Sequence, residues 1–151
     1  MAKISKILLA IDVVGEKRRL CDYTAMLARI FNAEVHAVYV VSSMRKYVKL
    51  TGNHEGVTDL REEAMRNARE MLDKAVAKHM PDTKVVTHVL GGESPASPLL
   101  NFARTEYCDL IVIGTRNRKG MGSILFGSVA EKILQLAEIP VMTIAPDAAQ
   151  D

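Results

Sequence analysis

The residues best suited to chemistry lie in one stretch, Asp109–Leu134, which reads DLIVIGTRNRKGMGSILFGSVAEKIL. It predicts a buried strand, then a loop rich in glycine and cations, then a helix that opens on Gly127 and Ser128. A helix N-terminus carries unpaired N–H donors and the positive end of the helix dipole. Because Arg116 and two further cations precede that helix start, the stretch predicts a phosphate-binding site.

A second chemical feature is Asp12, which directly follows the apolar run ILLAI. A carboxylate at a strand end can accept hydrogen bonds from ribose hydroxyls or an adenine edge. It can also cap a following helix, and both interpretations stay open here. The known phosphate and nucleophile motifs are missing, since the chain has no GK[ST] P-loop, no GxGxxG after the first strand and no GxSxG elbow.

The elements that position these residues can be read from hydrophobic patterns. Four continuously apolar, β-branched runs are typical of strands buried on both faces: Lys6–Ile11, Val35–Val41, Leu110–Ile113 and Val141–Ile144. A fifth run, Lys84–Leu90, reads as a strand nearer an edge. Helical patterns separate them at Leu20–Ile30, Asp59–His79, Pro95–Tyr107 and Gly127–Ala137. This alternation predicts a parallel sheet with helices on both faces and ligands at the carboxyl ends of its strands.

Composition limits the classes of function. A chain of 151 residues with 48% hydrophobic residues fits one globular domain, here 1–147, with 148–151 as a short tail. A net charge of +2 and 5% aromatic residues argue against nucleic acid as a partner, and no apolar run is long enough to cross a membrane. The two cysteines are expected to be buried and unpaired, and the four histidines are dispersed without metal-ligand spacing. The segment 42–57 is predicted as a long loop, either a flap over a site or a solvated connection.

Several segments together resemble the universal stress protein family. Nucleotide-binding members of that family carry a glycine, two residues, a second glycine, nine residues, then glycine and serine or threonine. Here Gly114 is followed by two residues and Asn117, which replaces the second glycine, and nine residues later come Gly127 and Ser128. The runs KILLAID, AEVHAVYVV, GGESPASPLL and IPVMTIAP are also similar to family segments, so the resemblance covers essentially the whole chain.

The resemblance implies a doubly wound α/β fold like that of adenine nucleotide alpha-hydrolases. The implied fold has five parallel strands in the order 3-2-1-4-5, and the resemblance also implies a homodimer formed through Val141–Ile144. It also implies ATP, with Mg²⁺, held at the carboxyl ends of strands 1 and 4. By position, the adenosine contacts would be Ala10, Asp12, Val40 and Ile113. The phosphate contacts would be Gly114, Arg116, Asn117, Gly127, Ser128 and Val129. Asparagine is the residue that most readily replaces glycine where φ is positive, so the loop can keep its turn at Asn117.

Three functions are weighed on these grounds. The first is a cytoplasmic ATP-binding regulator of a stress response, with no catalytic or metal-ligating residue assigned, and with slow hydrolysis left open if Mg²⁺ bridges the phosphates. The second is a dimeric interaction module that binds an unknown protein partner and no nucleotide. Asn117 and the Val13-Val14 pair favour it, because both depart from the family pattern. The third is an adenylate-forming or electron-transfer enzyme of related fold. The sequence disfavours it, because no catalytic constellation is found in this chain.

Overall fold

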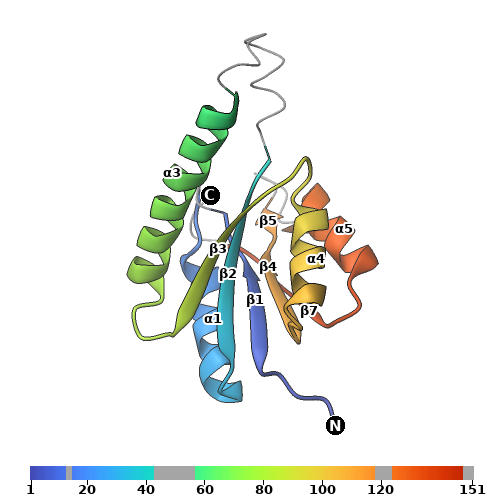
Figure 1. The fold of residues 1–151 in the computed structure, drawn as a ribbon. Helices are drawn as coiled ribbons and strands as arrows, with labels where there is room; N and C mark the ends of the chain where they lie inside the picture. The colour runs from blue at the N-terminus through green and yellow to red at the C-terminus, as the bar shows by residue number, and fades with distance from the viewer. Residues whose placement is uncertain (13–14, 43–56, 118–123, 148–151) are drawn as a thin grey trace.

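The structure is a computed structural model that describes residues 1–12, 15–42, 57–117 and 124–147. Its centre is a five-stranded, all-parallel sheet in the order β3-β2-β1-β4-β7, as predicted (Figure 1). The strands are β1 (Lys6–Ala10), β2 (Glu34–Val41), β3 (Val85–Gly91), β4 (Leu110–Gly114) and β7 (Val141–Ile144). The helices are α1 (Arg18–Phe31), α3 (Val57–His79), α4 (Ala96–Thr105) and α5 (Ser128–Leu136).

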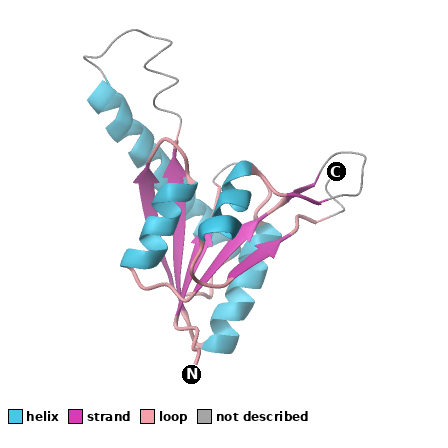
Figure 2. Ribbon diagram, turned by 90° about the vertical axis from the view of Figure 1, so that its right-hand side faces the viewer, coloured by secondary structure: helices cyan, strands magenta, loops and turns pink. Residues whose placement is uncertain are grey.

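Helices cover both faces of the twisted sheet (Figure 2). Alternate residues of each strand point to opposite faces, so the sheet has two core layers. On one face Ile7, Leu9 and Val112 pack with residues of α1 and α3, such as Leu27 and Leu72. On the other face, the intervening strand residues pack with residues of α4 and α5: Leu8, Ala10, Ile111 and Ile113 against Leu99, Phe102, Ala130 and Ile133. This double burial explains why the strands read as continuous apolar runs.

Asp109 aligns the two central strands. One of its carboxylate oxygens, Oδ2, accepts the backbone N–H groups of Ser5 at 2.8 Å and Lys6 at 2.9 Å. The N–H of Asp109 in turn donates to the carbonyl of Lys6 at 2.8 Å. These bonds fix the start of β1 against the start of β4. The carboxyl ends of both strands therefore lie side by side, where the candidate site lies.

The structure differs from the sequence-based expectations in several places. Residues Arg116–Asn117 (β5) and Ile124–Leu125 (β6) form a two-stranded antiparallel ribbon within the expected loop. The helices α1 and α3 each begin two residues before the predicted start, at Arg18 and Val57, and α4 ends at Thr105. Cys21 and Cys108 are both buried and unpaired, as expected. Within the described residues, none of the helices combines the length and apolar character that crossing a membrane requires.

Candidate functional site

The sheet order reverses between β1 and β4. The strands β2 and β3 lie on one side of β1, whereas β4 and β7 lie on its other side. Ligands of open α/β sheets bind at such a point, beyond the carboxyl ends of the strands. A cleft of about 970 Å³ lies there, near the upper end of the usual range for small-molecule sites. Nine of the ten predicted site residues line it: Ala10, Asp12, Val40, Ile113, Gly114, Arg116, Gly127, Ser128 and Val129.

Asn117 is the tenth predicted site residue. Its backbone lies in β5 and pairs with Ile124 of β6. The expectation of a positive-φ turn at Asn117 is wrong. Among the described non-glycine residues, φ is positive at Asn32 and Tyr107, whereas Asn117 belongs to an extended strand. The other residues on which the loop argument rests, Val13-Val14 and 118–123, lie outside the described part of the chain.

The start of α5 forms one wall of the cleft. Gly127 is the N-cap residue, with φ −64° and ψ 164°, and Ser128 is the first helical residue. Gly127, and not Ser128, is therefore the residue that caps the helix. The first N–H with an acceptor inside the helix belongs to Glu131 and donates to the Gly127 carbonyl at 3.0 Å. The N–H groups of Ser128, Val129 and Ala130 precede it, so they have no acceptor within the helix.

Neither Gly114 nor Gly127 is required by the backbone conformation. Neither has a φ in the left-handed region, so the backbone does not need glycine at these two positions. A Cβ at Gly127 would have its nearest neighbour, Arg116 Nε, at 3.9 Å. A Cβ at Gly114 would meet Leu20 Cδ2 at 3.8 Å and the Ile144 carbonyl at 3.9 Å. Both are ordinary contact distances, so the effect of these glycines is to leave the cleft open for close approach to the backbone.

Arg116 adds positive charge to the same wall. Its Nε lies close to the α5 N-terminus, as the 3.9 Å distance to a Gly127 Cβ shows, and its side chain is exposed. The ion pairs recorded between described residues are Arg18–Asp147 and His36–Glu34, and Arg116 takes part in neither. A cation beside the positive end of a helix dipole is unfavourable until an anion binds between them. This corner of the cleft thus favours a phosphate or carboxylate.

The opposite side of the cleft suits a flat apolar ring. Ala10, Val38, Val40, Leu99 and Ile113 are buried residues that line it. The strand β2 continues past the end of β1, where Ile11 N–H still donates to the Val38 carbonyl at 3.1 Å. Because backbone groups alternate with a period of two, the N–H and C=O of Val40 face the same side as those of Val38. They therefore point past the end of β1, where the Val40 N–H and C=O can form hydrogen bonds with the edge of a base.

Asp12 and Tyr39 meet at the rim of the cleft. Burial raises the pKa of Tyr39, and the nearby carboxylate of Asp12 raises it further, since both disfavour the phenolate. Both residues line the cleft, with Asp12 exposed and Tyr39 partly buried. The exposed position of Asp12 beyond β1 suits a carboxylate that accepts hydrogen bonds from ribose hydroxyls.

Sequence reasoning missed several polar groups in the cleft, among them Thr115, Lys17 and Ser42. Thr115 has a buried hydroxyl that lacks a hydrogen-bond partner among the described residues, which is costly unless a ligand or water supplies one. Lys17 lines the cleft at the start of α1, with its Nζ 2.8 Å from the Gly15 carbonyl. Ser42 lines it beyond β2. None of the three belongs to a periodic pattern, so only the folded arrangement reveals them.

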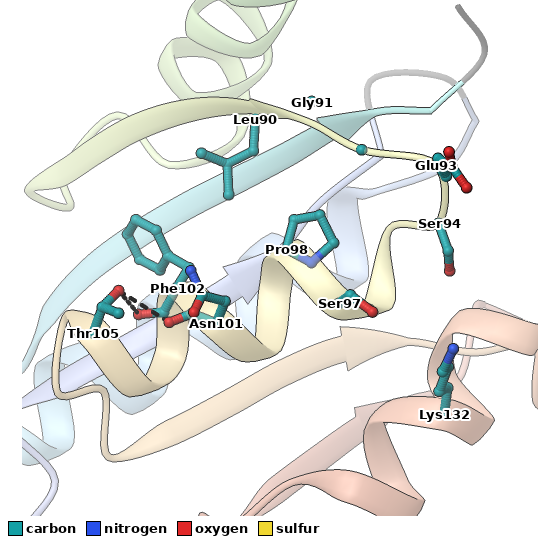
Figure 3. A pocket seen from close by; sticks show the side chains of 11 residues that line it. Leu90, Gly91, Glu93, Ser94, Ser97, Pro98, Asn101, Phe102, Thr105 and Lys132 are labelled. Carbon is teal, nitrogen blue, oxygen red and sulfur yellow. Dashed lines mark hydrogen bonds between the residues drawn. The ribbon is translucent and has the colours of Figure 1, made fainter. Parts of the chain in front are cut away.

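A second hollow, of about 820 Å³, lies between the end of β3, α4 and Lys132 of α5 (Figure 3). It contains none of the predicted site residues. Asn101 accepts a hydrogen bond from Arg104 at 3.0 Å, and Thr105 donates to the Asn101 carbonyl at 2.9 Å, so part of its polar lining is already paired. The cleft at β1 and β4 is therefore the better candidate site.

The chain is similar to known proteins over most of its length. The sequence pattern described as the Universal stress protein family matches residues 3–145. Universal stress protein MJ0531 of Methanocaldococcus jannaschii is 33% identical over 141 residues, which cover 92% of this chain and 81% of that protein. A universal stress protein structure from Archaeoglobus fulgidus has a TM-score of 0.68 at 25% identity, with 94% of each chain covered. Another, from the same organism in complex with dAMP, has a TM-score of 0.57 at 20% identity, covering 95% of this chain and 99% of that one.

Proposed function

Because the chain belongs to the universal stress protein family, we propose that it binds an adenine nucleotide, ATP, in the cleft at the carboxyl ends of β1 and β4. One observation carries the proposal. Nine residues chosen from sequence line one cleft, which combines buried apolar side chains with a helix N-terminus and Arg116. The Archaeoglobus structure described as a complex with dAMP supports an adenine nucleotide as the ligand class.

The proposed contacts follow from the two ends of the cleft. Adenine would lie among Ala10, Val38 and Ile113, with its edge bonded to the backbone of Val40. Asp12 would accept hydrogen bonds from the ribose hydroxyls. This orientation would direct the phosphates toward the wall formed by the start of α5.

At that wall, the phosphates would accept hydrogen bonds from the N–H groups of Ser128 and Val129 and from the Ser128 hydroxyl. Arg116 would neutralise phosphate charge, and the Thr115 hydroxyl is a further donor. Among the described residues, no group of three or more His, Cys, Asp or Glu is placed to hold a metal ion. Mg²⁺ would therefore be held mainly by phosphate oxygens and water, which is its usual behaviour with nucleotides.

Titration calorimetry with ATP, ADP, AMP and adenosine tests the proposal. We expect saturable binding of ATP, with affinity falling as phosphates are removed, because the phosphate wall contributes charge-assisted hydrogen bonds. Mass spectrometry of the supernatant from denatured protein, purified without added nucleotide, gives an independent readout. Absence of both heat and thermal shift at millimolar ATP, with no co-purified nucleotide, would reject the proposal and favour the interaction module without nucleotide.

We further propose a homodimer formed through β7, acting as a cytoplasmic stress-response regulator that does not turn ATP over rapidly. The strand β7 is the edge of the sheet, and its Val141, Met142 and Thr143 are partly exposed. The carbonyls of Pro140 and Ile144 accept hydrogen bonds from Ile111 and Thr115, so these alternate residues face β4. Val141 and Thr143 then direct their N–H and C=O groups outward, which leaves them available for a second strand.

The proposed dimer can be tested by sedimentation of wild-type protein and Thr143→Pro. Proline removes an outward N–H and leaves the hydrogen bonds of Pro140 and Ile144 to β4 in place. We expect a dimer for the wild type and a monomer for the variant. A wild-type monomer at all concentrations, or a variant dimer of unchanged affinity, would contradict pairing through β7.

A further inference from the structure

Two of the histidines that look dispersed in the sequence are in direct contact in the fold. His36 of β2 and His88 of β3 lie on the same face of neighbouring strands, with His36 Nδ1 and His88 Nε2 2.8 Å apart. Their rings stack with centroids 5.0 Å apart. The other nitrogen of His36, Nε2, lies 2.8 Å from a carboxylate oxygen of Glu34. We call His36 and His88 the histidine pair.

Helix α4 packs against the histidine pair through Phe102. Phe102, which points from α4 towards β3 (Figure 3), lies 4.7 Å from the His88 ring and 5.9 Å from the His36 ring, centroid to centroid. His36 is only 6% exposed, and His88 is partly buried. The pair therefore joins β2, β3 and α4, and the bond between its two rings is largely buried, whereas the Glu34 carboxylate that His36 contacts is exposed.

The two hydrogen bonds restrict how many protons the pair can bind. A carboxylate can only accept, so His36 Nε2–H donates to Glu34, and in neutral His36 the Nδ1 atom is an acceptor for His88 Nε2–H. One added proton keeps both bonds, since either ring can be the imidazolium that donates to the other. Two added protons place hydrogens on both facing nitrogens, which removes the 2.8 Å bond and brings two positive rings together.

The surrounding charges act on His88 from several elements. Burial lowers the pKa of His88, and the neighbouring His36 lowers it further. Arg69 of α3 and Lys6 of β1 act in the same direction, whereas Glu106, just after α4, raises it. Among the hydrogen bonds of the described residues, the carboxylate that contacts the pair is that of Glu34, and it bonds to His36. The environment therefore opposes a positive charge on His88 in the folded protein.

We propose that the histidine pair is an acid-sensitive contact, which accepts one proton in the folded protein and loosens α4 from β2 and β3 when a second proton binds. The unfolded chain binds a proton at each histidine below about pH 6. The folded chain then holds about one proton fewer, so acid favours unfolding by roughly tenfold in the folding equilibrium constant per pH unit. At pH 7.5 neither state is protonated, and the effect vanishes.

Urea unfolding of wild-type protein, His88→Gln and His79→Gln between pH 7.5 and 5 tests the proposal without any nucleotide. Glutamine can still donate to His36 Nδ1 but cannot bind a proton. His79, in the last turn of α3, is the control because it is not part of the pair. In the wild type, we expect the free energy of unfolding to fall with pH as if unfolding took up about one proton. We expect this uptake to disappear in His88→Gln and to remain in His79→Gln. Equal pH dependence in the wild type and both variants would overturn the proposal.

If His88→Gln does not fold, the wild-type protein still provides a test. Nitrogen chemical shifts of histidine-labelled protein at pH 5.5 report whether each ring is neutral or an imidazolium. We expect at most one imidazolium in the pair while the amide spectrum remains that of the folded protein. Two imidazolium rings in a folded protein with unchanged Phe102 signals would overturn the proposal.

Discussion

Replacing Gly127 by aspartate should stabilise the protein while abolishing nucleotide binding. Gly127 has the extended backbone of an N-cap residue, with φ −64° and ψ 164° and no side-chain cap. Aspartate is among the best N-cap residues, because its carboxylate accepts the orphan N–H groups of the first helical turn. The same carboxylate would lie near Arg116, where the phosphates are proposed to bind. Folding and binding should thus change in opposite directions.

Both magnitudes can be worked out from this geometry. The cap and the favourable interaction with the dipole of α5 together contribute about 0.5–1 kcal/mol, which raises Tm by about 1–4 °C in a chain of this size. Two like charges about 4 Å apart near a protein surface repel by about 4 kcal/mol at an effective dielectric of 20. Because residue 127 is partly exposed, solvent reduces this to about 2–4 kcal/mol, or roughly 30- to 1,000-fold in affinity for ATP.

The assay pairs calorimetry with thermal unfolding for the wild type, Gly127→Asp and Gly127→Ala. Alanine adds only a methyl group, whose nearest neighbour in the protein would be 3.9 Å away, so its effect on binding isolates the close approach of the ligand. We expect a small loss of affinity for alanine and a large one for aspartate. ATP binding by Gly127→Asp within threefold of the wild type would refute the placement of the phosphates at α5.

Three further predictions concern the rest of the molecule. Arg116→Gln should weaken ATP binding by about tenfold and leave adenosine binding unchanged, as measured by calorimetry, because only the phosphates meet this side chain; an equal loss for both ligands would place Arg116 elsewhere. Burial raises the pKa of both Cys21 and Cys108 to about 11, so both thiols should react very slowly with a disulfide reagent at pH 7.5 in the folded protein and rapidly in urea. Fast labelling of the native protein would contradict this burial. Leu72→Ala, at a position with 0% exposure, should lower the free energy of unfolding by about 2–5 kcal/mol in urea titrations, whereas Met71→Ala, at a position with 45% exposure, should have a much smaller effect.

The central sheet could be predicted from sequence because its strands are buried on both faces. Runs such as Ile7–Ile11 and Leu110–Ile113 have no polar face, and this pattern is specific to parallel sheets covered by helices. The strand order came from the family resemblance and not from the pattern itself. The candidate site residues also came from the resemblance. The fold brings nine of them to one cleft at the carboxyl ends of β1 and β4 and the start of α5, and their contact with a ligand stays a prediction.

What the sequence did not reveal depends on contacts between distant segments. The ribbon of β5 and β6 has two residues in each strand, too short for any period, so Asn117 was expected in a turn and lies in a strand. His36 and His88 are 52 residues apart and meet only through the register of β2 with β3. The buried hydroxyl of Thr115 likewise follows from packing and not from any motif. Local patterns cannot specify such pairings, because they depend on tertiary arrangement.

The most direct test of the central claim is the set of backbone amide signals that ATP shifts in a nitrogen-labelled protein. The proposal predicts saturable shifts at Val40, Gly114, Ser128 and Val129, around the cleft of β1 and β4. Residues of the second hollow, such as Ser97 and Asn101, should stay unchanged. Shifts confined to that second hollow, or none at millimolar ATP, would contradict the account.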